Sequence, residues 1–370
     1  MTAYLDVTTL IADPRRSGIQ RVERALIARW PDPASLTLCR FDGEGMRIVP
    51  EGAKAVLCGE APQGGASEEA HRLAPFVAAS ATPVPPDADV LCAELFDDPA
   101  RAAWHRSRDG SRWLLFDALP WTHPEWFPAG PAVRLMPYLH AAAAVRRAYI
   151  SAASKRCFET IFRAPCSGPV CPLGADGLGL EAQQFRPDRR DVVMLGSIEP
   201  RKNTLAALEA FRALWREGLE ARLVLIGRLE PDAAAERALL DALAGEARLL
   251  VFGVASDAVV RQALRTARVL LFPSEGEGYG LPPTEALASG LPVIVAESLP
   301  SLQDQPRDGQ IRLARPDAAA IAGAIRICFD DGEARRLWRA AAARFPTWAE
   351  FAAGVAGWVR DGASPDRAQG

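Results

Sequence analysis

The sequence predicts an α/β protein made of two Rossmann-like domains, each with a doubly wound parallel sheet, that face each other across a cleft. Short continuous apolar runs recur along the second half and alternate with helical segments. This pattern is typical of parallel strands that helices cover on both faces. The first half contains similar runs at less regular spacing. A length of 370 residues also favours two domains, because single cores stop growing near about 250–300 residues.

The first half is interpreted as one domain with long insertions, over residues 1–182. Its expected strands are 3–7, 36–40, 90–93 and 113–117, and its expected helices are 19–30 and 141–162. Residues 43–50 favour a small hairpin. Residues 59–89 contain adjacent glycines and five prolines, which indicates a surface excursion. The polar segment 183–190, interrupted by a proline, is expected to link the domains.

The second half, over residues 191–345, shows the alternation clearly. Its expected strands are 192–195, 222–227, 249–253, 269–273 and 292–296. The helices expected between and after them are 204–215, 233–243, 257–267 and 283–289. Ligands of such sheets bind at the carboxyl ends of the strands, so the segments after the strands are where we look for a site.

Composition excludes several classes of protein. Lysine and arginine total 43 against 46 acidic residues, which argues against a general nucleic-acid binder. No apolar run reaches the roughly 18 residues of a membrane span, and the first residues lack the basic start of a signal peptide. The seven cysteines are scattered without a Cys-x-x-Cys pair. We therefore expect a cytoplasmic protein with free thiols and without a zinc site.

The strongest motif is the glycine-rich segment 273–290, which follows one expected strand and leads into a helix. Glycines at 276, 278 and 280 let the backbone approach a ligand closely. Two prolines suit the start of the helix, whose free N–H groups form an anion site. The segment therefore favours a phosphate ligand.

Two acids bracket this loop, Glu277 and Glu285. Carboxylates on both sides of an anion site suit a diphosphate with hydroxyl groups at either end, as in a nucleotide sugar. The alternative is a glycine-rich turn with one solvated acid and one acid that interacts with the helix dipole.

A second motif, residues 195–203, also follows an expected strand and opens a helix. Adjacent Arg201 and Lys202 are suited to a diphosphate, the arginine through its fork and the lysine as a point charge. In a cleavage reaction they would stabilise the charge that grows on the leaving group. The alternative is a solvated basic turn.

These motifs resemble those of the retaining glycosyltransferases of family 4, which have the GT-B fold. Glu277 and Glu285 match the Glu-x7-Glu signature, and Arg201-Lys202-Asn203 matches the basic motif. The resemblance implies that Glu277 contacts the transferred sugar and that Glu285 binds ribose hydroxyls. Many members have arginine where this chain has Ser197, and Arg201 is then its expected substitute.

The N-terminal half resembles a branch related to bacterial O-antigen mannosyltransferases. Residues 17–22 match its Gly-Ile-x-Arg loop, and residues 116–125 match its segment with Asp, Pro and Pro-Glu. Phe116 stands where many members have a histidine. His123 either supplies an imidazole near the sugar or packs against Trp121 and Trp126. Residues 346–370 are expected to form a helix that packs back on the N-terminal domain.

The resemblance implies two sets of site residues. The catalytic residues are Glu277, Lys202, Arg201, His123 and Asp117. The donor-binding residues are Gly18, Gly196, Ser197, Gly227, Val254, Gly278, Tyr279, Gly280, Leu281 and Glu285.

The predicted function is transfer of a hexose, with retention, from a nucleotide diphosphate sugar to a polysaccharide or lipid-linked glycan. GDP-mannose is expected as donor from the resemblance, together with a role in O-antigen or lipopolysaccharide synthesis and a peripheral contact at the cytoplasmic face of the inner membrane. No metal or other cofactor is expected, because no Asp-x-Asp signature or histidine cluster accompanies the strands of the second half.

Two other functions remain open from the sequence. A GT-B-shaped binding or scaffold protein that has lost catalysis fits Phe116, but the Glu277, Glu285 and Lys202 set argues against it. A nicotinamide-dependent dehydrogenase is disfavoured because Gly-x-Gly-x-x-Gly is absent after the first strand.

Overall fold

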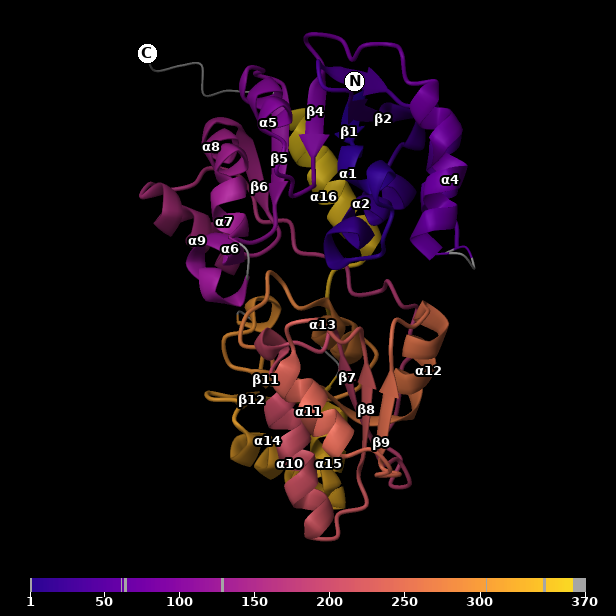
Figure 1. The fold of residues 1–370 in the computed structure, drawn as a ribbon, viewed down its shortest axis with the longest axis vertical. Coiled ribbons are helices and arrows are strands. Elements are labelled where there is room, and N and C mark those ends of the chain that lie inside the picture. Colours follow the sequence, from indigo (N-terminus) through magenta and orange to yellow (C-terminus); the bar gives the residue numbers. More distant parts are fainter. Residues whose placement is uncertain are drawn as a thin grey trace. The chain divides into compact units, whose positions relative to one another are not determined.

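The computed structural model describes residues 2–60, 62, 65–127, 130–303, 305–341 and 344–361. The chain divides into two compact units, one formed by Met1–Gly174 with Pro346–Gly370 and the other by Ala175–Phe345 (Figure 1). Each unit contains one six-stranded sheet. The predicted fold class, two α/β units with parallel sheets, is therefore confirmed.

The sheet of the first unit has the strand order β3-β2-β1-β4-β5-β6. All neighbouring pairs are parallel except β2 with β3, which forms the hairpin expected near residues 43–50. The strands are β1 (Ala3–Asp6), β2 (Leu36–Phe41), β3 (Met46–Ile48), β4 (Asp89–Cys92), β5 (Ser111–Leu115) and β6 (Arg146–Tyr149).

Helices cover this sheet. They are α1 (Thr8–Ala12), α2 (Gly18–Arg29), α3 (Gly52–Cys58), α4 (Gly65–Ala78), α5 (Pro99–Arg106), α6 (Leu119–Thr122), α7 (Pro131–Arg134), α8 (Met136–Ala144), α9 (Ala152–Phe162) and α16 (Trp348–Asp361), with short 3₁₀ turns η1 (Pro33–Ser35) and η2 (Pro124–Trp126). The expected surface excursion, residues 59–89, contains α4, whose Leu73 is buried, so part of it belongs to the core.

The single helix expected over residues 141–162 is wrong. The segment contains the end of α8, the strand β6 and the helix α9. β6 pairs with β5, and its Ala148 and Tyr149 are fully buried. Alanine and arginine around the strand mimic a helical composition, but the edge of the sheet offers hydrogen bonds that local propensity does not reveal.

The sheet of the second unit is fully parallel, with the order β12-β11-β10-β7-β8-β9. Its strands are β7 (Asp191–Leu195), β8 (Arg222–Ile226), β9 (Leu249–Phe252), β10 (Ala267–Phe272), β11 (Val293–Ala296) and β12 (Gln310–Leu313). Its helices are α10 (Thr204–Arg216), α11 (Ala234–Ala242), α12 (Asp257–Thr266), α13 (Leu281–Ala288), α14 (Ala318–Phe329) and α15 (Asp331–Ala340), with η3 (Pro200–Lys202) and η4 (Pro300–Leu302).

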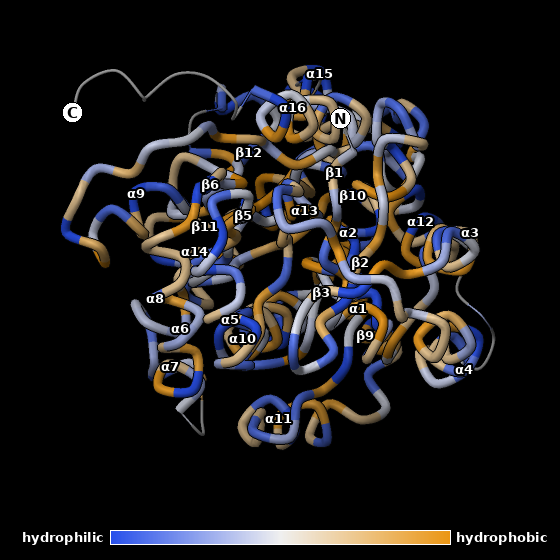
Figure 2. Tube along the Cα trace, turned by 90° about the horizontal axis from the view of Figure 1, so that it is seen from above, coloured by the Kyte–Doolittle hydropathy of each residue, from blue (hydrophilic) through white to orange (hydrophobic). Residues whose placement is uncertain are grey.

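Both faces of this sheet are buried, as the continuous apolar strands predict. Val192 and Met194 of β7 pack into the core beneath α10 and α14, whereas Val193 and Leu195 pack into the core on the other face. Figure 2 shows helices such as α4 and α11 with both hydrophilic and hydrophobic residues. This is the pattern of helices with one face on a core.

The division between the units lies at Gly174, before the sequence-based boundary. Ala175 and Leu178 already belong to a core of the second unit. The expected linker 183–190 is also fixed there: the Gln183 amide donates to the Ser289 carbonyl at 2.7 Å, and Arg189 donates to the Ala267 carbonyl at 3.0 Å.

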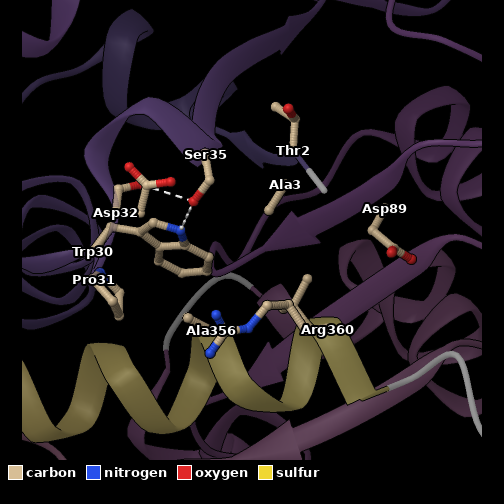
Figure 3. A pocket seen from close by; sticks show the side chains of 10 residues that line it. Thr2, Ala3, Trp30, Pro31, Asp32, Ser35, Asp89, Ala356 and Arg360 are labelled. Atoms are coloured by element: carbon tan, nitrogen blue, oxygen red, sulfur yellow. Dashed lines mark hydrogen bonds between the residues drawn. The ribbon is translucent and has the colours of Figure 1, made fainter.

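Helix α16 runs beside α2 in the first unit (Figure 1). Its residues line a cavity of about 20 Å³ with Trp30, Asp32 and Ser35. Figure 3 shows that the Trp30 Nε1–H donates to Ser35 Oγ, and that Ser35 Oγ–H donates to the Asp32 carbonyl. A cavity of this size has room for a single water molecule.

Within the described ranges, no helix combines the length and apolar composition needed to cross a membrane.

Candidate functional site

The site is organised by the strand order of the second unit. β7 lies in the middle of the sheet beside β10, and the chain proceeds outward in opposite directions from this pair. In a doubly wound sheet, the crevice at such a switch point, outside the carboxyl ends of the strands, is where ligands bind. The two motifs singled out in the sequence follow β7 and β10, so the topology brings them to the same place.

Three predicted residues meet there. Lys202 Nζ lies 2.5 Å from Glu277 Oε1, and Arg201 Nη1 lies 3.6 Å from the same oxygen. The three side chains are 12–18% exposed. Two cations thus share one carboxylate at a partly buried position, where charge interactions are stronger than in water.

Backbone geometry holds the two loops together. Arg201 and Lys202 belong to the 3₁₀ turn η3, and Asn203 ends this turn with a φ of +59° before α10 begins. The Glu275 amide donates to the Arg201 carbonyl at 3.0 Å, and Arg201 Nη1–H donates to the Gly276 carbonyl at 2.7 Å. The cations are therefore placed by bonds to the loop that carries Glu277.

Two of the predicted glycines are required by this packing. Gly196 has a φ of +128°, and a Cβ there would lie 3.3 Å from Lys202 Cε. A Cβ on Gly227 would lie 1.8 Å from the Gly196 carbonyl oxygen, a distance that no side chain can accommodate. The lysine side chain thus runs close to bare backbone, with Nζ 5.1 Å from the Phe272 ring centroid.

The glycine-rich loop ends at Gly280, which precedes α13 with a φ of +94°. The Ser301 amide donates to the Tyr279 carbonyl at 3.0 Å, and Ser301 Oγ–H donates to the Gly280 carbonyl at 3.1 Å. Tyr279 and Leu281 are buried. Hydrogen bonds from the segment that follows β11 thus fix the end of the glycine-rich loop.

Glu285 lies in the second turn of α13, because this helix begins at Leu281 rather than at residue 283. The residue is 1% exposed. Gly278 lies in the loop before the helix, and Val254, just after β9, is 87% exposed.

Sequence reasoning missed Glu199. Its Oε1 accepts hydrogen bonds from Ser197 Oγ at 2.8 Å and from Arg201 Nη2 at 2.6 Å. Glu199 therefore orients the Arg201 guanidinium and accepts the hydrogen bond of the Ser197 hydroxyl. An acid two residues before a functional arginine in the same loop is the signal that could have identified it.

The remaining predicted residues lie in the first unit. Asp117 follows β5 and accepts the Leu119 amide at 3.0 Å. The His123 ring stacks on Trp126, with centroids 4.0 Å apart, and its Nδ1 lies 3.0 Å from Glu125 Oε1. The ring thus packs on one of the two tryptophans named above, while 43% of the His123 side chain stays exposed.

Gly18 opens α2, directly after the N-cap Ser17, whose side chain forms a capping box with Gln20. A Cβ at Gly18 would meet nothing within 4 Å. The chain itself therefore does not require glycine at this position.

A buried polar network lies at the switch point of the first sheet, between β1 and β4. Arg101 Nε–H donates to Asp6 Oδ2 at 2.8 Å, and Arg101 also pairs with Glu94. Burial raises the pKa of Asp6, but Arg101 and His105 outweigh burial and hold this pKa below its usual range.

Asp6, Cys92 and His105 place possible ligand atoms within 4.8 Å of one another. Asp6 Oδ2 already accepts from Arg101, and His105 Nε2 lies 2.9 Å from the same oxygen. A guanidinium in contact with a ligand atom opposes a metal cation, so we interpret this set as a structural network.

The chain is similar to known proteins in sequence and in fold. Residues 180–345 match the family model "Glycosyl transferases group 1". A stretch of 107 residues is 35% identical to the serotype-specific mannosyltransferase WbdA of Escherichia coli. The stretch covers 28% of this chain and 13% of WbdA. A stretch of 175 residues is 30% identical to the MMP alpha-(1->4)-mannosyltransferase of Mycolicibacterium hassiacum and covers 45% of this chain and 41% of that protein. The chain thus matches less than half of the length of these relatives.

Among solved structures, Anabaena HepE in complex with UDP and glucose superposes with a TM-score of 0.64 at 15% sequence identity, covering 96% of this chain and 98% of HepE. This likeness concerns the fold.

Proposed function

From the GT-B fold, the match of residues 180–345 to glycosyl transferases group 1 and the similarity to an O-antigen chain mannosyltransferase of Escherichia coli, we propose that the protein is a glycosyltransferase. It transfers a hexose from a nucleotide diphosphate sugar to a glycan acceptor. The observation that carries this proposal is the meeting of Lys202, Arg201 and Glu277 at the switch point of the second sheet.

The proposed chemistry follows from the charges. The bond between the anomeric carbon and the diphosphate oxygen breaks, an acceptor hydroxyl oxygen bonds to that carbon, and the hydroxyl proton passes to the departing diphosphate. Lys202 and Arg201 stabilise the charge that develops on the departing diphosphate. Glu277 holds both cations in place and offers its carboxylate to the sugar hydroxyls.

The finer features are also proposals. Mannose from GDP-mannose is supported by the names of the relatives. Retention at the anomeric carbon and transfer without a metal ion are supported by the match of Glu277 and Glu285 to the signature of family 4. In a metal-free reaction, Lys202 and Arg201 would do the work of a divalent cation. A lipid-linked acceptor at the inner membrane remains part of this proposal.

The test is calorimetric titration of GDP, UDP and ADP into the wild type and Lys202→Ala. A hydrogen bond to a charged group contributes about 1.5–3 kcal/mol, so the favoured nucleotide is expected to bind roughly tenfold or more weakly to the variant. Lys155→Ala, in the first unit, is the matched control and should bind nucleotide as the wild type does. Equal affinity of wild type and Lys202→Ala would refute the phosphate role.

A second candidate function is nucleotide-sugar binding without transfer. One observation supports it: Phe116 is buried where many members of the family have a histidine, and the nearby His123 ring stacks on Trp126. Release of nucleotide diphosphate from GDP-mannose in the absence of acceptor distinguishes the two, because a pure binding protein releases none.

A further inference from the structure

We propose that the second unit has a separate binding site for neutral sugar residues of the glycan, in a groove beside the Lys202 cluster. The groove has a volume of about 630 Å³, within the roughly 300–1,000 Å³ of small-molecule sites. Its polar lining residues are Asn203, Glu209, Glu275, Ser298, Arg315 and Asp317. This inference rests on the proposed function and extends it to a second carbohydrate subsite.

The groove lies at the ligand-binding edge of the sheet. Asn203 follows β7, Glu275 follows β10, and Arg315 follows β12, so the groove opens at the carboxyl ends of parallel strands. It adjoins the cluster because Asn203 succeeds Lys202 in the chain. Its lining nevertheless excludes Lys202, so a ligand in the groove does not need the diphosphate position.

The walls hold unused hydrogen-bonding capacity. In the part of the chain that the structure describes, the side chains of Glu209, Glu275 and Arg315 form no hydrogen bond or ion pair. The two carboxylates accept hydrogen bonds and the guanidinium donates them. Sugar hydroxyls both donate and accept hydrogen bonds. A hydroxyl-rich ligand can therefore pair with the carboxylates and with the guanidinium at the same time.

The charge of the groove selects against phosphate. Glu209, Glu275 and Asp317 are acidic, and Arg315 is the single basic residue in the lining. An anion would therefore be repelled here, in contrast to the Lys202 cluster. Alanines and a proline form the rest of the lining and suit the apolar C–H face of a sugar ring. The ligand class that fits is a neutral glycan.

The two walls are fixed relative to each other before any ligand binds. Asn203 Nδ2–H donates to the Pro316 carbonyl at 2.6 Å and so links the start of α10 to the segment before α14. Asp317 caps α14 by accepting the Ala320 amide at 2.9 Å. Residues of α10 and α14 share one core. The backbone of the two walls therefore needs little rearrangement when a sugar enters.

The experiment measures saturation-transfer NMR of an α-linked mannotriose with the full-length protein, in the presence of saturating GDP. GDP occupies the nucleotide position, so binding that persists is not at that position, and its loss in the groove variants assigns it to the groove. We expect saturable binding by the wild type, and at least fivefold weaker binding by Arg315→Ala and by Glu209→Gln. Mannose 6-phosphate is expected to bind less well than mannose because of the acidic walls.

Arg216→Ala is the matched control for Arg315→Ala, since Arg216 is an exposed arginine on α10 outside the groove. GDP affinity should stay unchanged in all three variants. Absence of mannotriose binding in the wild type, or unchanged binding in both groove variants, overturns the proposal. Failure of GDP to bind the wild type would instead contradict the proposed function, and the mannotriose titration would still test the groove.

Discussion

The Glu277 carboxylate lies close to both Lys202 and Arg201, and its negative charge competes with a diphosphate for these two cations. Glu277→Gln keeps the shape of the side chain and removes the charge, which frees Lys202 and Arg201 for an incoming diphosphate. We expect GDP affinity in this variant to be equal to or higher than in the wild type, while transfer slows by about tenfold or more because one transition-state interaction is lost. Calorimetry and the rate of nucleotide release check the two parts.

The contrast with Lys202→Ala makes this prediction specific. The lysine variant should lose nucleotide affinity, and the glutamate variant should lose rate. Loss of GDP affinity in both variants to the same extent would mean that Glu277 only maintains the local fold.

Gly227 is required for steric reasons rather than for flexibility. A Cβ at this position would lie 1.8 Å from the Gly196 carbonyl oxygen, so Gly227→Ala forces apart the ends of β7 and β8. We expect a loss of at least about 3 kcal/mol in the free energy of unfolding, as for severe overpacking. Urea unfolding measures it.

Gly323→Ala is the control for this substitution. Gly323 lies inside α14, and a Cβ there would meet nothing within 4 Å. Alanine is favoured over glycine in a helix by about 0.5–1 kcal/mol, so this variant should be at least as stable as the wild type. Similar stabilities of the two variants would contradict the steric account of Gly227.

At the scale of elements, the two sheets use their switch points differently. In the second sheet the loops after β7 and β10 present cations and bare backbone. In the first sheet the corresponding place, after β1 and β4, is occupied by the protein's own groups: Glu94 accepts the amides of Thr9 and Leu10 at 3.0 and 2.8 Å. The network thus fixes α1 against the sheet.

Glu23 gives this network a measurable pH dependence. Burial, together with the neighbouring Glu94 carboxylate, raises the pKa of Glu23 well above its usual range. A raised pKa in the folded state means that stability is fully present below the unfolded pKa, near 4.5, and falls as the pH rises toward the folded value. Glu23→Gln removes this loss, so the stability of the variant relative to the wild type should increase between pH 5 and pH 8.

Urea unfolding at several pH values tests this, with Glu44→Gln as control, because the Glu44 side chain is 89% exposed in the same unit. A difference between Glu23→Gln and the wild type that does not change with pH would show that Glu23 is ionised in the folded protein.

The sequence predicted those elements whose signal is local. The strands of the second unit are continuous apolar runs between helices, and the loops after β7 and β10 contain the glycines and charges that a phosphate site needs. β6 was not predicted, because its role as a strand comes from pairing with β5. The Glu199 contacts with Ser197 and Arg201 depend on how η3 folds, which composition does not show.

At the scale of the whole molecule, the connectivity divides the chain unevenly. The first unit is completed by α16 from the end of the chain, whereas the second unit is one continuous stretch. The sequence predicted the two domains from length and alternation, but it placed the boundary at a polar segment. Polarity marks exposure, and residues 183–190 are fixed to the second unit by hydrogen bonds that only the folded chain reveals.

Two compact units, each with its own buried clusters, predict two unfolding transitions in scanning calorimetry. Trp348 is 5% exposed, packs its ring edge-on against Phe351, and lies so close to Gly174 that a Cβ there would be 2.3 Å from the Trp348 nitrogen. Trp348→Ala should cost about 3–5 kcal/mol and lower the melting temperature of the first unit by about 10 °C.

GDP should raise the melting temperature of the other transition, because a ligand stabilises the unit that binds it. Trp215→Ala is the mirror control: Trp215 is buried in the second unit, so this variant should lower the transition that GDP raises. If either tryptophan variant lowered both melting temperatures equally, the stabilities of the two units would be coupled, and the assignment of one transition to each unit would be wrong.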